Sequence, residues 1–153
     1  MGNPVAKSVE LFTRDPKAAA EAVFESHKGE AAWLDAFSEH LDQQRAREAF
    51  ARTLDVWDLS QSEVARILGV SRQAVGKWVE KGLPPERAAM AADLAGATDL
   101  LVRYLKRDRI PAVVRRPIAA HSDATLLELL ARDGSAAVLE ACRQMFDFRH
   151  VGE

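Results

Sequence analysis

The chain has 153 residues, of which 48% are hydrophobic and 29% charged, and its formal net charge is −2. The near-neutral charge argues against bulk, sequence-independent binding of nucleic acid. The single cysteine, Cys142, excludes a disulfide framework and favours a reducing, cytoplasmic setting. We expect neither a signal peptide nor a membrane span, because no apolar run has the required length. Abundant Ala, Leu, Glu and Arg predict an all-α fold.

Three helices are predicted in the N-terminal third. Asp15 followed by Pro16 is typical of an N-cap and a first helical residue, and this helix should end near His27 to Gly29. A second helix is expected from about residue 30, and a third from about residue 44 to residue 57. Their apolar faces would carry Trp33, Leu34, Phe37 and Leu41 in the second helix, and Phe50, Leu54 and Trp57 in the third.

The remaining pattern predicts two short helices, 61–68 and 72–81, joined by a turn at Gly69 to Ser71. Further helices are expected over 85–95, 97–107, 112–119, 124–131 and 135–145. We therefore expect three parts along the chain. They are an N-terminal helical extension (1–43), a helix-turn-helix DNA-binding domain (44–108) and a helical partner-binding domain (109–153).

The segment from Gln61 to Trp78 fits a helix-turn-helix at the positions that packing constrains. Gly69 stands where the turn needs a positive φ, and Ser60 and Ser71 are suited to cap the two helices. Ser60 with Glu63 also has the spacing of a capping box. The small core between the helices would consist of Val64, Leu68, Val70, Val75 and Trp78, and Ala65 is small because the second helix crosses close above it. A helical hairpin that binds nothing is the alternative, and it leaves the basic second helix unexplained.

The second helix of such a motif lies in the major groove of DNA. Arg72 can donate two hydrogen bonds to guanine, and Gln73 can pair with adenine. Gly76 would allow a close approach to the duplex, and Lys77 would reach a base or a phosphate. Ser71, at the N-terminal end of the same helix, is a further candidate DNA-binding residue. Gln61 either contacts phosphate or merely caps the first helix.

From Leu59 to Lys81 the chain resembles helix-turn-helix regulators of the Xre/Cro type. Residues 109–148 resemble the toxin-binding domain of Xre/MbcA/ParS antitoxins. The similarity lies in Arg115-Arg116-Pro117, the run Leu126 to Leu130, and Gly134 before the last helix. Val113-Val114 and His121-Ser122-Asp123 depart from the family pattern of Trp-Leu and Leu-Gly-Gly. The resemblance implies an antitoxin that binds its own operator and neutralises a toxin of the RES class.

The resemblance also implies that the C-terminal end reaches toward the toxin. Candidate partner-binding residues are Arg116, Phe146, Phe148 and Arg149. The two phenylalanines are costly to leave in water, so they pack either on the protein's own core or on a partner. Basic charge is concentrated in residues 59–82, with a net charge of +2, and in residues 101–120, with +5. The stretch 103–116 could contact phosphate, dock an acidic partner, or form an ordinary solvated face.

No catalytic motif is recognisable, so an enzyme, a metal site and a cofactor are not expected. The four histidines (His27, His40, His121 and His150) have no partner at a diagnostic spacing. Alternatives to an antitoxin are a stand-alone regulator and the DNA-targeting subunit of a larger machine. Each would be a dimer on double-stranded DNA, because one helix-turn-helix reads only a few base pairs. The dimer surface could be the N-terminal helices, with Trp33, Phe37 and Phe50, or the C-terminal helices.

Overall fold

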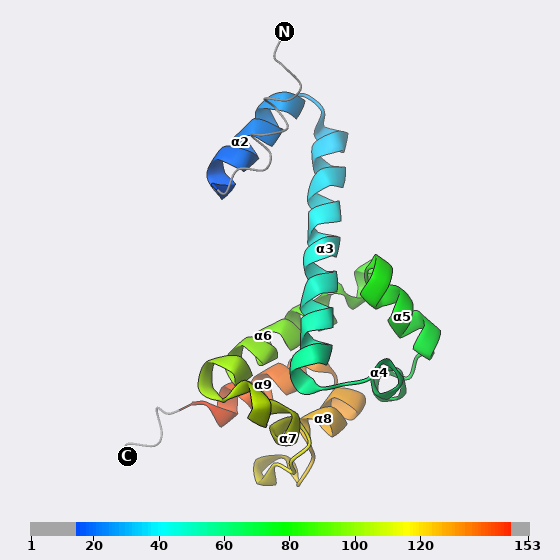
Figure 1. The fold of residues 1–153 in the computed structure, drawn as a ribbon, viewed down its shortest axis with the longest axis vertical. Helices are drawn as coiled ribbons and strands as arrows, with labels where there is room; N and C mark the ends of the chain where they lie inside the picture. Colours follow the sequence, from blue (N-terminus) through cyan, green and yellow to red (C-terminus); the bar gives the residue numbers. More distant parts are fainter. Residues whose placement is uncertain (1–14, 148–153) are drawn as a thin grey trace. The chain divides into compact units, whose positions relative to one another are not determined.

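The computed structural model describes residues 15–147, which form α-helices joined by short connections (Figure 1). These residues contain no β-strand, only an isolated bridge between Ile118 and Ala124. The all-α prediction is therefore confirmed. The longer helices are α2 (Pro16–His27), α3 (Ala31–Trp57), α4 (Gln61–Leu68), α5 (Arg72–Lys81), α6 (Ala88–Tyr104), α8 (Leu126–Asp133) and α9 (Ser135–Met145). Shorter ones are η1 (Pro85–Arg87), η2 (Arg107–Arg109), α7 (Ile110–Val114) and η3 (Ala119–His121).

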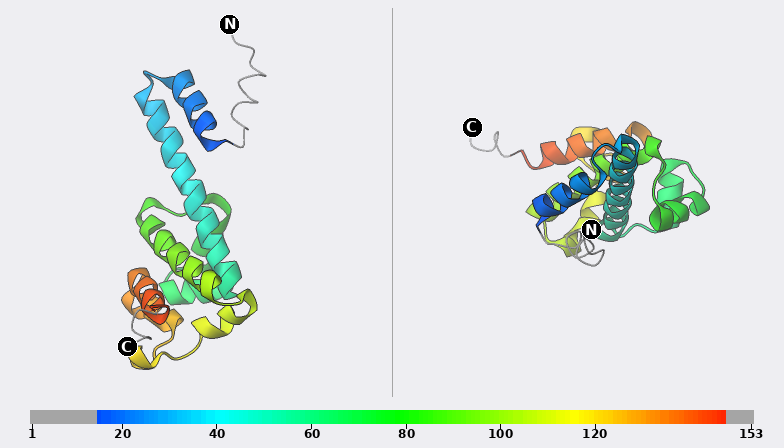
Figure 2. Two further views of the ribbon diagram at one scale, coloured as in Figure 1. Left: turned by 90° about the vertical axis from the view of Figure 1, so that its left-hand side faces the viewer. Right: turned by 90° about the horizontal axis from the view of Figure 1, so that it is seen from above.

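Contacts divide the chain into two compact units, residues 1–42 and residues 43–153. We call their described parts, 15–42 and 43–147, the N-terminal unit and the C-terminal unit. Within residues 15–147, no helix is both long and apolar enough to cross a lipid bilayer. Residues 44–108 and 109–147, which the sequence suggested as separate domains, lie in the same unit and share one core. They do so because α6 packs along α9 and α4 packs against α8 (Figure 2).

The N-terminal unit begins as the sequence predicts. Asp15 caps α2 by accepting a hydrogen bond from the Lys17 N–H (3.1 Å), and Pro16 occupies the first helical position. No residue of α2 is buried. The break expected near residues 41–44 does not occur, and α3 is one helix of 27 residues. Asp42-Gln43-Gln44 contains no Gly or Pro, so nothing local stops the helix there.

The C-terminal unit has a continuous apolar core to which nearly every helix contributes. The largest side chains with no exposed surface include Phe50 and Trp57 from α3 and Leu101 from α6. A small polar group completes this core, because the Trp57 indole N–H donates to Thr98 Oγ1 (3.1 Å). Thr98 also donates to a backbone carbonyl of its own helix, so its buried hydroxyl is satisfied. Phe50 was predicted as a candidate for the dimer surface. That prediction is wrong, because Phe50 is fully buried in this core.

Helix α6 also differs from the prediction, because one helix replaces the two expected over 85–95 and 97–107. Pro84 and Pro85 lead into the short η1 turn rather than into α6 directly. Helix α6 continues through Gly96, which faces α9: an added Cβ would lie 3.2 Å from Leu139 Cδ1. Pro111 lies in the first turn of α7, where its missing N–H removes no helical hydrogen bond.

Candidate nucleic-acid interface

Helices α4 and α5 are joined by a tight turn whose local structure follows from its sequence. Ser60 caps α4: its Oγ accepts from the Glu63 N–H (3.1 Å), and the Glu63 carboxylate accepts from the Ser60 N–H (3.1 Å). Gly69 ends α4 in the left-handed region, with φ of 68°. Ser71 then caps α5 by accepting from the Ala74 N–H (3.0 Å). The predicted capping box, glycine turn and second cap are all confirmed.

The inner face of the α4–α5 pair is anchored in the core of the C-terminal unit. Val64 and Ala65 of α4 and Val75 and Trp78 of α5 are buried. The Trp78 ring meets the Phe50 ring of α3 edge-on, with 6.0 Å between the centroids. Trp78 is therefore a core residue, as the sequence indicated, and the rotation of α5 about its axis is determined by this packing.

The outer face of α5 carries the predicted base-reading residues. Arg72, Gln73 and Lys77 are all exposed, while Val75 and Trp78 lie on the opposite side of the same helix. At about 100° per residue, these three side chains and Gly76 fall on one face. This exposed ridge can therefore approach a flat or concave partner without unpacking the core. Glu80 lies on the same face one turn further on and is also exposed.

Gly76 and Gln61 turn out to be neighbours. An added Cβ at position 76 would lie 3.2 Å from the Gln61 amide oxygen. Gln61 is half-buried, so its side chain lies against α5 rather than extending freely from the start of α4. The glycine therefore leaves room for the Gln61 amide against α5. The same contact places Gln61 beside the ridge formed by Arg72, Gln73 and Lys77.

Two arginines to which the sequence assigned no structural role hold the α4–α5 pair in place. Arg47 on α3 donates to the Glu80 carbonyl of α5 (2.9 Å). Arg115, just after α7, donates to the carbonyls of Trp57 (2.8 Å) and Asp58 (2.7 Å), which lead into α4. Its guanidinium also lies 3.6 Å from the Glu63 carboxylate of the capping box. These partners are more than thirty residues apart in sequence, so no local signal could have indicated them.

The basic stretch 103–116 is only partly available to a partner. Arg115 is committed to backbone carbonyls, and Arg107 forms an ion pair with Asp55 of α3. Arg109 and Arg116 are exposed. The structure thus assigns intramolecular roles to Arg107 and Arg115, while Arg116, a predicted partner-binding residue, is accessible.

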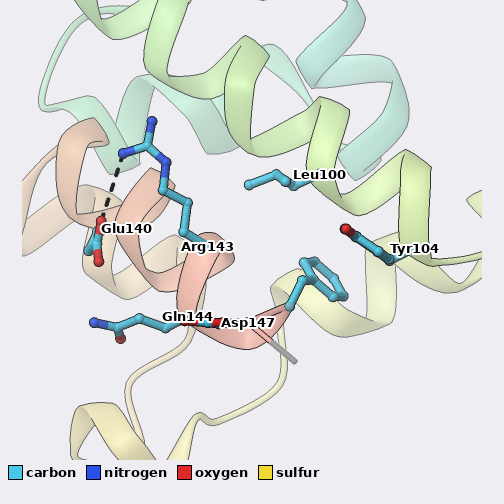
Figure 3. Close-up of a pocket in the computed structure, with 7 residues that line it drawn as sticks. Leu100, Tyr104, Glu140, Arg143, Gln144 and Asp147 are labelled. Carbon is cyan, nitrogen blue, oxygen red and sulfur yellow. Dashed lines mark ion pairs between the residues drawn. The ribbon is translucent and has the colours of Figure 1, made fainter. Parts of the chain in front are cut away.

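The other predicted partner-binding residues lie at the C-terminal end of the described chain. Phe146 is half-buried and stacks on Tyr104 of α6, with 4.7 Å between the ring centroids. Phe148 and Arg149 lie outside the described residues. Phe146 contributes to an open groove of about 690 Å³ between α6 and α9 (Figure 3). The groove is also lined by Leu100, Tyr104, Glu140, Arg143, Gln144 and Asp147.

Reactive groups are scarce in the part of the chain that the structure describes. Cys142 is fully buried on α9, and burial raises the pKa of its thiol to about 12. Such a thiol is protonated at neutral pH and is a poor nucleophile. Among residues 15–147, no group of three His, Cys, Asp or Glu side chains is arranged to hold a metal ion.

The sequence was compared with protein-family models and with curated proteins. No protein-family model matches the chain, and no curated protein matches it.

Proposed function

We propose that this chain is a sequence-specific DNA-binding regulator that inserts α5 into the major groove. The observation that carries the proposal is the division of α5 into two faces. Val75 and Trp78 anchor one face in the core, and the opposite face presents Arg72, Gln73 and Lys77 to solvent. In this arrangement Arg72 reads guanine, Gln73 reads adenine, and Lys77 contacts a base or a phosphate. Gln61 and the capped N-terminus of α4 contact the adjacent backbone.

The direct test is selection of a binding site from random DNA, followed by affinity measurements on the selected sequence. Arg72→Ala should weaken binding by about 5- to 150-fold, since a bidentate contact to a base is worth about 1–3 kcal/mol. It should also relax the preference at one base position. A matched control is Arg132→Ala, because Arg132 is an exposed arginine on α8 whose ion pair is with its sequence neighbour Asp133. Unchanged affinity and preference in Arg72→Ala would contradict the proposal.

We further propose that the regulator is a cytoplasmic antitoxin whose C-terminal half neutralises a RES-type toxin. The support is the resemblance of residues 109–148 to the toxin-binding domain of Xre/MbcA/ParS antitoxins. The accessible Arg116 and the groove beside Phe146 would offer this partner a basic side chain and an aromatic surface. The role proposed here is binding and not catalysis, and it requires no cofactor.

The antitoxin proposal is tested by expressing the chain together with the product of the neighbouring gene. A neutralised toxin should co-purify with the full chain. A chain that lacks residues 144–153 should still bind DNA but should protect poorly against the toxin. Equal protection by the truncated chain would contradict a C-terminal contact. A chain that selects DNA but has no toxic neighbour would support the second candidate, a stand-alone dimeric regulator.

A further inference from the structure

We propose that two copies of this chain associate through the N-terminal unit, with the apolar stripe of one copy covering that of the other. The stripe consists of Phe24 from α2 and Trp33, Phe37 and Leu41 from α3. This surface would bring two α5 helices to one operator. The biological role of the dimer therefore rests on the proposed DNA-binding function. The association itself can be measured without DNA.

The N-terminal unit lacks a core of its own. Phe24 is 56% exposed, Leu41 48%, and Trp33 and Phe37 38% each. None of the residues 15–42 is buried, and the buried residues of α3 begin only at Phe50. An isolated helix as short as α2, with 12 residues, is marginal in water, and most helices in proteins are stabilised by packing an apolar face. A partner surface that covers the exposed stripe would therefore stabilise the N-terminal unit.

The stripe is also organised before any partner arrives. The rings of Trp33 and Phe37 are stacked with 5.2 Å between centroids and 11° between planes. The His27 ring lies nearly parallel to Trp33, at 7°. Aromatic side chains held in this way lose little conformational freedom on binding, which favours association.

The area of the stripe suits a second copy. A large apolar side chain offers about 150–250 Å², so the four exposed fractions amount to roughly 350 Å² per copy. A stable interface buries about 800 Å² per partner, of which roughly 57% is non-polar. The stripe would thus supply most of the apolar share of an interface of ordinary size. A two-fold dimer pairs one patch with itself, and stacked aromatic rings can do so without complementary charges at the centre.

The net charge of the N-terminal unit predicts how its self-association depends on salt. Residues 15–42 contain seven carboxylate side chains and two lysines, a net charge of −5. Two such units repel each other, and salt screens that repulsion. Self-association through the stripes should therefore tighten as the salt concentration rises. Docking of the acidic unit onto a basic surface, such as residues 101–120 of another copy, should weaken instead.

Sedimentation equilibrium of the full chain between about 1 and 100 μM tests the proposal. We expect a dimer whose dissociation constant decreases as the NaCl concentration is raised from 50 to 500 mM. Phe37→Glu should weaken dimerisation at least 100-fold. Leu41→Glu should do the same and leaves the stacked rings intact, which guards against a local folding defect. The matched control is Val102→Glu, because Val102 is equally exposed (38%) but lies in the C-terminal unit, and this variant should remain dimeric.

A monomeric wild-type chain would overturn the proposal, as would a dimer that survives both substitutions or weakens with salt. A chain that becomes dimeric only when residues 1–14 are removed would also overturn it, because its own N-terminal segment would then cover the stripe. These outcomes are separable from failure of the proposed function. A monomer that still selects a DNA sequence refutes the dimer alone, and a dimer that ignores DNA refutes the DNA-binding role alone.

Discussion

The two units of the molecule are built from similar helices but are stabilised in different ways. In the C-terminal unit, α3 to α9 bury Phe50, Trp57 and Leu101 completely around a common core. In the N-terminal unit, α2 and the first turns of α3 bury no residue, although they carry more exposed large apolar side chains. The difference teaches that helical sequence and amphipathic spacing are not sufficient for a core. A core also requires neighbouring elements that close over the apolar face.

The largest effect that would sharpen this comparison comes from truncating one phenylalanine in each unit. Phe50→Ala should lower the free energy of unfolding of the C-terminal unit by about 3–5 kcal/mol, because it leaves a cavity in a closed core. Phe37→Ala should change it by less than about 0.5 kcal/mol, as surface substitutions usually do. Chemical denaturation followed by near-ultraviolet circular dichroism, at a concentration where association contributes nothing, measures both. Equal losses would show that the N-terminal unit has a core of its own.

A smaller effect is expected at the two adjacent arginines after α7. Arg115→Ala removes the donor to the Trp57 and Asp58 carbonyls, and hydrogen bonds with a charged partner are worth about 1.5–3 kcal/mol. We expect a loss of that size in the free energy of unfolding, together with weaker DNA binding, because α4 is no longer held at its start. Arg116→Ala, at an exposed neighbour, should leave both quantities unchanged and affect only partner binding. If the two variants behave alike, the structural role assigned to Arg115 is wrong.

The smallest effect concerns the N-cap side chain of one helix in each unit. Ser60→Ala should cost about 1 kcal/mol of global stability, because α4 is packed in the core and its cap is lost. Asp15→Ala removes the N-cap of α2, which accepts from the Lys17 N–H. There we expect lower helical content by far-ultraviolet circular dichroism with no shift of the main unfolding transition. A shift of that transition in Asp15→Ala would mean that α2 unfolds together with the core.

Local features of the fold were predictable because their interactions span only a few residues. The cap of α2 at Asp15, the capping box at Ser60, the left-handed Gly69 and the cap at Ser71 were all recognised from neighbouring residue types. The bounds of α4, α5 and α9 followed from the same signals. So did the division of α5 into a buried and an exposed face, since apolar spacing alone separates Val75 and Trp78 from Arg72, Gln73 and Lys77.

Tertiary structure decided the features that depend on residues far apart in the chain. Packing of α6 along α9 and of α4 against α8 joined residues 44–147 into one unit. Contacts with distant carbonyls gave Arg47 and Arg115 their structural roles, and closure of the core buried Phe50 while it left Phe37 exposed. The reason is physical. A cap or a turn is completed by atoms within about four residues, whereas burial depends on which other elements arrive, and one helix's sequence does not contain that information.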